Sequence, residues 1–407
     1  MNICLLTRTT LRHSMGGMEQ HIRMLSEGLA RKGHRVTLIT TAHPDGKSER
    51  ELSNGVAIHY LPGTVPGRYS SSFYKKSIVK FIELHEKDPF TIIHSQSGGG
   101  FAFLKQRISR KYHVPVVVTM HGIFYNELVT RLNILFSWGG SLQEKAKSFL
   151  LVFYYLFVYF TKDLPLIPKA EAVISTSSKQ KKLMKKLYSL ADHQLFLVHN
   201  GVDLAPKNTA ASAPSKESLG LSRKNVLLCI ARLKKEKGIH VAFAALPKVL
   251  VHHPDTLLVI VGDGEYRETL VQQARELIIE KNVLFIGTVP YEGLSTYYTA
   301  ADIFINSTIR ENGYDLTIVQ AMGYEKPVVV TRLKSLEGVI EDGSNGILFS
   351  MGNSDELARH VTALLNDKAA AAALGKQAGL TYNKYFSAER MVENTVAVYE
   401  ASQKAVP

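Results

Sequence analysis

A polar loop that runs into a helix is predicted between Arg310 and Pro327, where the sequence reads RENGYDLTIVQAMGYEKP. Asp315 suits the N-cap position, because apolar residues recur at helical spacing directly after it. Such a loop brings free backbone N–H groups and the positive end of a helix dipole to one place, which suits a phosphate or a sugar hydroxyl. Every α/β protein has several turns of this kind, so the loop is evidence for a binding site only together with the other motifs.

Two cations flank a second loop, ARLKKEKG, in the same half of the chain. Arg232 follows the end of a predicted strand, and Lys237 directly precedes the next helix. If both side chains converge on one crevice, they can neutralise a diphosphate. A solvated run of charged residues is the alternative for this loop taken alone.

Glycine-containing turns follow two predicted strands. Gly16 and Gly17, within MGGME, would let the backbone approach a diphosphate, although an ordinary tight turn explains them equally well. Asp263 and Gly264, within VGDG, have the same two interpretations. The sequence contains no GxGxxG motif, which argues against a dinucleotide site of that type.

Two histidines end predicted strands of the first half. His94 ends TIIH and is followed by Gln96, and His121 ends VPVVVTMH. Active-site groups of open parallel sheets collect at the carboxyl ends of strands. A single histidine at such a position is commonly structural, but two in successive loops favour function.

Strands and helices alternate through the whole chain, and the pattern begins twice. It starts with a strand over 1–6 and a helix over 18–32, and it restarts with a strand over 225–231 after a stretch rich in Ala, Ser and Pro at 205–220. We therefore predict an α/β protein with two doubly wound, Rossmann-like parallel-sheet domains. The predicted boundaries are 1–204 and 205–382, followed by a helical segment over 383–407 that packs back on the first domain. Further strands are predicted at 36–40, 91–94, 114–119, 172–175, 195–198, 257–261, 283–286, 303–306 and 328–330.

Composition and charge limit the kinds of binding partner that this chain can have. The chain has 407 residues, of which 45% are hydrophobic and 21% charged, and its net charge is +13. The first 200 residues carry +14 and the remainder −1, which indicates an anionic partner for the first half. Nothing resembles a nucleic-acid-binding motif. The two cysteines, Cys4 and Cys229, lie in apolar runs and are predicted to be buried free thiols, so we expect a cytoplasmic protein without a signal peptide.

Residues 149–160, FLLVFYYLFVYF, form an almost unbroken apolar and aromatic run. Because a membrane-spanning helix needs about 20 residues, this run is predicted not to span. A buried helix is as well supported as the alternative, which is an interfacial membrane helix or a hydrophobic surface for the acceptor. The basic segment KQKKLMKK at 179–186 favours an anionic membrane surface as the partner of the second arrangement.

Taken in order, these motifs resemble the retaining glycosyltransferases of family four. The motifs are GGME, TMHG, HNGVD, ARLKKEKG, VGDG, TAADIFINST and ENGYDLTIVQAM with the following KPVV, and they cover nearly the whole chain. The resemblance implies the GT-B fold, in which two doubly wound domains face each other across an interdomain cleft. It also implies a nucleotide-sugar donor held mainly by the second domain.

The resemblance assigns roles to individual residues. Arg232 and Lys237 match the pair that holds the donor diphosphate, and His121 matches a histidine near the donor sugar. Gly16 and Gly17 match the loop that reaches the donor from the first domain. The remaining donor-binding candidates are Asp263, Gly264, Glu311, Asn312, Gly313, Tyr314, Asp315, Leu316 and Gln320, and the acceptor candidates are His94 and Gln96.

The sequence departs from the family pattern at two positions. The family usually carries two glutamates where this chain has Asn312 and Gln320. At Gln320 a carboxylate would bind both ribose hydroxyls, whereas an amide offers a single acceptor oxygen. Glu311 is adjacent to the first position and could replace it if the loop shifts by one residue.

The expected activity is transfer of a sugar from a nucleoside diphosphate sugar, with UDP favoured over GDP, to a glycan or lipid-linked acceptor. The anomeric configuration would be retained, and the product would belong to cell-surface polysaccharide or glycolipid synthesis. We expect no metal and no other cofactor, because no Asp-x-Asp pair stands in a strand-end loop and the cations can stabilise the leaving diphosphate. The alternative is a catalytically weak, nucleotide-sugar-binding partner subunit. An epimerase of the same architecture is less well supported, because no pair of acid–base carboxylates can be placed.

Overall fold

The protein divides into two compact units in a computed structural model. Unit 1 comprises Met1–Gly201 and Ala388–Pro407, and unit 2 comprises Val202–Ser387. These limits lie within about five residues of the boundaries expected from sequence. The residues that the structure describes are 1–14, 16–46, 49–122, 128–129, 131–132, 135, 142–204, 216, 219, 221–222, 224–310 and 315–404.

Unit 1 is built on an eight-stranded sheet with the order β3-β4-β2-β1-β5-β6-β7-β8. The central strands β1 and β6 are buried at every position, as expected of parallel strands with helices on both faces. The strands are β1 (Asn2–Leu6), β2 (Arg35–Thr40), β3 (Arg50–Ser53), β4 (Val56–Tyr60), β5 (Ile92–Gln96), β6 (Val116–Met120), β7 (Ala172–Ser175) and β8 (Leu195–Leu197).

One edge strand of unit 1 departs from the parallel arrangement of the rest of the sheet. Strand β3 pairs antiparallel with β4. Only Asn54 and Gly55 join the two strands, and both have positive φ values, of 48° and 81°. A two-residue turn cannot make the crossover that parallel strands need, and Asn-Gly is the favoured sequence for such a hairpin.

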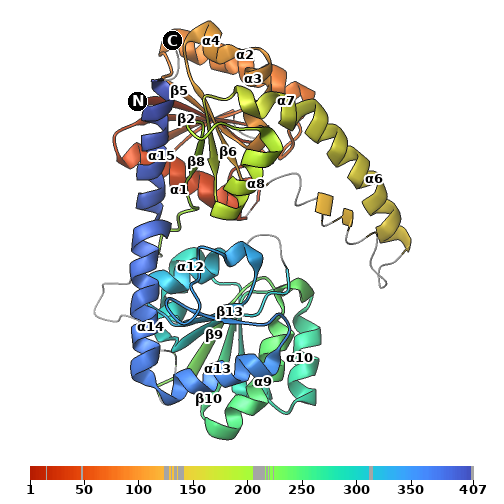
Figure 1. Ribbon diagram of the computed structural model, residues 1–407, viewed down its shortest axis with the longest axis vertical. Helices are drawn as coiled ribbons and strands as arrows, with labels where there is room; N and C mark the ends of the chain where they lie inside the picture. The colour runs from red at the N-terminus through yellow and green to blue at the C-terminus, as the bar shows by residue number, and fades with distance from the viewer. Residues whose placement is uncertain are drawn as a thin grey trace. The chain divides into compact units, whose positions relative to one another are not determined.

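The C-terminal helix belongs to the core of unit 1. Helix α15 (Ala388–Gln403) buries Met391, Val392 and Tyr399 in the apolar cluster that also contains Ile3 and Leu5 of β1. Figure 1 shows α15 beside α1, which agrees with the contacts between these two helices. The other helices of unit 1 are α1 (Gly17–Arg31), α2 (Ser71–Lys87), α3 (Phe101–Lys105), α4 (Ile108–Tyr112), α6 (Leu142–Val158), α7 (Leu164–Leu166) and α8 (Ser178–Tyr188).

Unit 2 contains a six-stranded parallel sheet with the order β11-β10-β9-β12-β13-β14. Its strands are β9 (Asn225–Ile230), β10 (Thr256–Val261), β11 (Val283–Gly287), β12 (Ile303–Asn306), β13 (Val328–Thr331) and β14 (Ile347–Phe349). Its helices are α9 (Ile239–His252), α10 (Arg267–Glu276), α11 (Leu294–Ala300), α12 (Leu316–Gly323), α13 (Ser354–Asn366) and α14 (Lys368–Thr381). The predicted fold class, two doubly wound α/β domains, is confirmed.

Both cysteines are buried free thiols, as predicted. Cys4 lies in β1 and Cys229 in β9. Burial raises the pKa of both thiols, that of Cys229 to about 12, so both remain protonated at neutral pH.

Candidate functional site

The first cluster of candidate residues lies in unit 2, where the loop after β9 meets the loop after β12. Gly238 has a φ of 63°, and a Cβ atom at this position would overlap the carbonyl oxygen of Ser307. The hydroxyl of Ser307 donates to the carbonyl oxygen of Gly238 at 2.8 Å. Glycine is therefore required at this crossing, and the crossing fixes Lys237 against the carboxyl end of β12.

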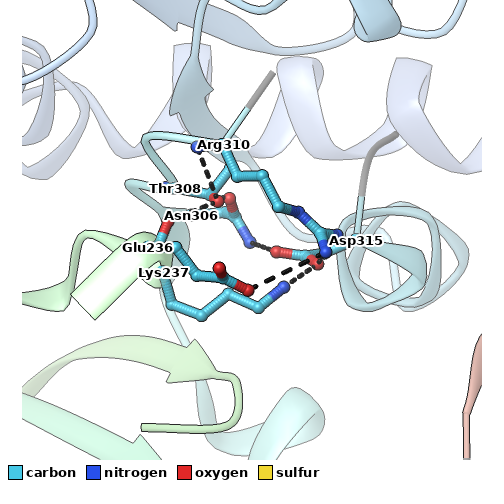
Figure 2. Close-up of polar contacts among 6 residues, drawn as sticks. All are labelled: Glu236, Lys237, Asn306, Thr308, Arg310 and Asp315. Atoms are coloured by element: carbon cyan, nitrogen blue, oxygen red, sulfur yellow. Dashed lines mark hydrogen bonds and ion pairs between the residues drawn. The ribbon is translucent and has the colours of Figure 1, made fainter. Parts of the chain in front are cut away.

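Lys237 and Asp315 form a buried ion pair at this crossing (Figure 2). Their side chains expose only 9% and 15% of their surface. Nδ2 of Asn306 donates to the second carboxylate oxygen of Asp315 at 3.0 Å. The charge of Lys237 is thus already compensated within unit 2, so any bound anion competes with Asp315 for its ammonium group.

Asp315 occupies the predicted N-cap position of α12, but its side chain makes no capping hydrogen bond. The carboxylate turns instead toward Lys237 and Asn306. The N–H groups of the first turn of α12, beginning at Leu316, consequently have no side-chain cap. They remain suited to an anion.

A second cation, Arg310, borders the same cluster. Its guanidinium lies 4.0 Å from Asp315 and 3.8 Å from Glu236, and Figure 2 shows it extended over the pair. Sequence reasoning named neither Arg310 nor Asn306 as a site residue. Their place at the carboxyl end of β12 was the available signal, since this edge of a parallel sheet collects binding groups.

The structure places Asp263 and Gly264 against the loop that carries Arg232. The N–H of Leu233 donates to the carbonyl oxygen of Asp263 at 3.0 Å, and the carboxylate of Asp263 accepts from the N–H of Gly264 at 2.8 Å. Gly262 has a φ of 129° and lies against the carbonyl of Ala231, which no residue with a Cβ atom could do. The side chain of Arg232 is exposed beside this turn.

Gln320 lies apart from these cations. It is buried in α12, and its carbonyl oxygen accepts a hydrogen bond from the hydroxyl of Tyr298 at 2.9 Å. Tyr298 stacks on Tyr324 with ring centroids 4.8 Å apart. One lone pair of the side-chain oxygen of Gln320 is therefore already used by a hydrogen bond within unit 2. The other predicted members of this loop, Glu311, Asn312, Gly313 and Tyr314, lie outside the described residues.

Unit 1 brings the other candidates together in one hydrogen-bonded line. Nε2 of His121 donates to the side-chain oxygen Oε1 of Gln96 at 2.6 Å. The side-chain nitrogen Nε2 of Gln96 donates in turn to Nε2 of His94 at 3.3 Å. Nδ1 of His94 lies 2.6 Å from the hydroxyl of Tyr399 in α15. Because Nε2 of His94 accepts in this arrangement, its ring proton lies on Nδ1 and faces Tyr399.

The sequence pattern predicted that His94 ends its strand at the start of a loop. In the structure it lies inside the strand. Strand β5 continues two residues beyond it, and its side chain is fully buried. This position gives His94 a supporting relationship to Gln96 and His121. Tyr399 was missed because it lies among apolar positions of a helix 305 residues away, where no local pattern marks it.

Gly16 and Gly17 begin α1 close to His121. Gly16 is the N-cap residue with a φ of −149°, an extended conformation open to any residue, so no positive φ is involved. The ring of His21, in the second turn of α1, packs edge-on against His121 with centroids 4.5 Å apart. The first turn of α1 and His121 are therefore neighbours.

His21, His94 and His121 are held neutral by burial. Burial lowers the pKa of His21 to about 4 and that of His94 to about 3, and it lowers the pKa of His121 well below the usual value. At neutral pH His121 can thus exchange hydrogen bonds with a hydroxyl, but it does not act as a cation.

An open cavity of about 280 Å³, lined by both polar and apolar side chains, lies in unit 1 beside α1, β3 and β4. Glu51 at its wall accepts hydrogen bonds from Arg12 at 2.8 Å and from Tyr60 at 2.9 Å. No sequence motif marks this cavity, because its lining residues come from separate elements. The charged and polar side chains of the lining include Arg12, Glu19, Arg23, Glu27, Glu51 and Tyr60.

Within the described ranges, no three His, Cys, Asp or Glu side chains converge as metal ligands. The expectation of metal-free chemistry stays a prediction, as do the individual binding roles given above.

Comparison with known proteins identifies the class. Residues 15–206 match the model of Glycosyltransferase Family 4, and residues 213–380 match that of Glycosyl transferases group 1. The chain is 24% identical to alpha-monoglucosyldiacylglycerol synthase of Acholeplasma laidlawii over 382 residues, which cover 91% of this chain and 90% of the relative. It is 24% identical to an uncharacterized glycosyltransferase of Methanocaldococcus jannaschii over 411 residues, or 99% of each chain.

Solved structures agree in fold. Sucrose-phosphate synthase from Thermosynechococcus elongatus matches with a TM-score of 0.73 at 20% identity, covering 99% of both chains. HepE of Anabaena in complex with UDP matches with a TM-score of 0.72 at 19% identity, covering 98% of this chain and 100% of that one. The family models and the fold thus define a glycosyltransferase of the GT-B type. Within that class, the chain belongs to family four.

Proposed function

We propose that this glycosyltransferase moves a sugar from a nucleoside diphosphate sugar, with UDP favoured over GDP, to a hydroxyl of a glycan or lipid-linked acceptor. The transfer retains the anomeric configuration, needs no metal ion and takes place in the cytoplasm, in the synthesis of a cell-surface polysaccharide or glycolipid. The observation that carries the proposal is the buried Lys237, which lies at the uncapped N-terminus of α12 beside Arg310.

The chemistry requires a place for negative charge. The bond between the anomeric carbon and the diphosphate oxygen breaks, and the diphosphate leaves with the bonding electron pair. The acceptor oxygen bonds to the anomeric carbon, and its proton passes to the departing diphosphate. Lys237, Arg232 and the N–H groups of α12 stabilise that charge in unit 2, which is the main task of such a site. The donor must first draw Lys237 away from Asp315, so binding includes an exchange of one anion for another.

Unit 1 contributes groups suited to hydroxyls. A neutral His121 held by Gln96 can bind a sugar hydroxyl. The cavity beside β3 and β4 offers carboxylates and guanidinium groups, which pair with the hydroxyls of an acceptor sugar. Similarity to an alpha-monoglucosyldiacylglycerol synthase supports a lipid-linked acceptor, and similarity to HepE, which has been solved in complex with UDP, supports UDP.

A second function has an observation in its favour. The carbonyl oxygen of Gln320 is already bonded to Tyr298, and Lys237 is already paired with Asp315, so the donor site is partly self-satisfied. Both features suit a subunit that binds a nucleotide sugar weakly and catalyses little.

Nucleotide release from a panel of UDP- and GDP-sugars tests the proposal. Stabilisation of the protein by one nucleotide, together with slow release from one matching sugar, is the expected result. Binding without release, even with membrane lipid extract as acceptor, would favour the partner-subunit function. The absence of any binding would contradict both.

A further inference from the structure

Helix α6 and the π-helical turn that follows it (Tyr159–Asp163) carry an exposed apolar stripe. Phe149, Leu150, Phe153, Tyr154, Phe157 and Phe160 expose between 53% and 70% of their surface. In a helix these positions fall on one side, within about 140° of each other, because each residue advances by about 100°. Figure 1 shows α6 extending away from the sheet of unit 1. The exposure of these side chains shows that they are not part of the unit's core.

Lysines lie near both ends of the stripe. Lys145 and Lys147 lie at the N-terminal end of α6, and Lys162 lies in the π-helical turn Tyr159–Asp163 that follows it. Residues 142–188 contain nine lysines against three acidic residues. An apolar face bordered by cations is the composition of helices that bind anionic bilayers.

Helix α8 adds to this charge next to the base of α6. The hydroxyl of Tyr159 donates to the carbonyl oxygen of Leu187 at 2.8 Å, which joins the end of α6 to the end of α8. Three exposed lysines of α8, at positions 179, 182 and 186, recur at helical spacing. The basic segment recognised in the sequence therefore belongs to the same region of unit 1.

A membrane-crossing arrangement conflicts with the sheet. The stretch Lys145–Lys169 is long and apolar enough to cross a bilayer, so the expectation that the run is too short is corrected. Strand β6 precedes this stretch and β7 follows it, yet the two strands pair directly. A single crossing would place them on opposite sides of the membrane. A second crossing would have to use residues 121–141, which include Glu127 and Arg131 and are therefore costly to insert.

We propose that α6 lies in the plane of an anionic lipid bilayer, with its aromatic face in the acyl region and the lysines of α6 and α8 on the headgroups. A second copy of the chain is the less suitable occupant. Two such faces in contact would bring lysine-rich surfaces together without acidic partners. The inference rests on unit 1 alone and does not depend on the proposed donor chemistry.

Vesicle flotation of the full chain tests this surface. Phosphatidylcholine vesicles with phosphatidylglycerol should carry the protein to the top of the gradient, and phosphatidylcholine alone should not. Phe153→Glu with Phe157→Glu should abolish flotation without changing the thermal midpoint, because both side chains are exposed. Val251→Glu, an equally exposed apolar position on α9 of unit 2, is the matched control and should float like the wild type.

Lysine substitutions and a test for dimers complete the experiment. Replacing Lys179, Lys182 and Lys186 with glutamine should weaken flotation and flatten its salt dependence. Flotation that ignores phosphatidylglycerol, or that survives both glutamates, would overturn the proposal. So would lipid-free wild-type dimers that the two glutamates convert to monomers. The thermal shift produced by UDP should be the same in all these variants, which separates this outcome from failure of the proposed function.

Discussion

The hydroxyl of Tyr399 lies 2.6 Å from Nδ1 of His94, although the two residues are 305 positions apart in the chain. This contact connects the C-terminal helix α15 to the line of groups that ends at His121. The end of the chain therefore contributes to the part of unit 1 in which the proposed sugar-binding histidine is held.

Tyr399→Phe should weaken both folding and turnover. Removing the hydroxyl leaves a buried N–H of His94 without a partner, which costs about 1–3 kcal/mol of unfolding free energy. Because Gln96 and His121 depend on His94, we expect kcat to fall several-fold. UDP affinity should remain unchanged, since the diphosphate cations belong to unit 2. Tyr112→Phe is the control, because its hydroxyl has no hydrogen bond to any residue that the structure describes; equal effects of the two substitutions would remove the positioning role of Tyr399.

Acid should destabilise the protein through the buried histidines. The folded-state pKa values of about 4 for His21 and about 3 for His94 lie below the usual 6.5, so the unfolded state binds more protons as the pH falls below 6.5. Between pH 6.5 and the pKa of each histidine in the folded state, that histidine lowers the free energy of unfolding by about 1.4 kcal/mol per pH unit. Asp163, whose pKa is raised to about 6 by burial, opposes this loss over part of the range.

Urea unfolding at several pH values checks this dependence. The free energy of unfolding should decrease from neutral to mildly acidic pH, and His94→Gln should reduce that slope by roughly one histidine's share. A slope that is the same in His94→Gln and the wild type would show that His94 is not the buried neutral group described.

Asp315→Asn should have opposite effects on stability and on binding. It leaves the ammonium group of Lys237 buried without its counter-charge, which should cost about 3–5 kcal/mol of unfolding free energy in the ligand-free protein. It also removes the anion that competes with the diphosphate, so UDP should bind about tenfold more tightly, a gain of about 1.4 kcal/mol. Thermal shifts with and without UDP measure both effects. A UDP affinity that falls would mean that Asp315 supports the donor instead of competing with it.

Replacing Asn312 and Gln320 with glutamate would distinguish the two proposed functions, an active enzyme and a partner subunit. Gln320→Glu keeps an acceptor for the hydroxyl of Tyr298 and adds a second oxygen for the donor ribose. With Asn312→Glu in the same chain, an enzyme should change its turnover with the matching sugar nucleotide. A subunit without catalytic function should gain binding only, and the release assay distinguishes the two results.

Much of the fold was predictable because the core strands are long apolar runs with clear endings. The strands over 172–175 and 303–306 were predicted with the limits that the structure has. Strands β3, β4 and β14 were missed. β3 is a short edge strand of sequence RELS, half of it exposed, and β14 has only three residues, so both are too short for a clear strand pattern. β4 was missed although its sequence VAIHY is largely apolar.

The site was less predictable, since pairing is a tertiary property. Lys237 could be recognised as a cation at a strand–helix junction, but its partner Asp315 is 78 residues away and was expected to cap a helix. His94 was recognised by its type, whereas its burial depends on how far β5 continues and on α15. Residue type and spacing thus indicate the candidates, and long-range contacts decide what each of them can bind.

The most direct test of the central claim is calorimetric titration of UDP into the wild type, Lys237→Ala and Lys248→Ala. Lys248 is an exposed lysine of α9 in the same unit and serves as the matched control. The proposed site predicts that Lys237→Ala loses about 2–4 kcal/mol of binding free energy, whereas Lys248→Ala binds like the wild type. Equal affinities in all three proteins would contradict the assignment of Lys237 to the donor diphosphate.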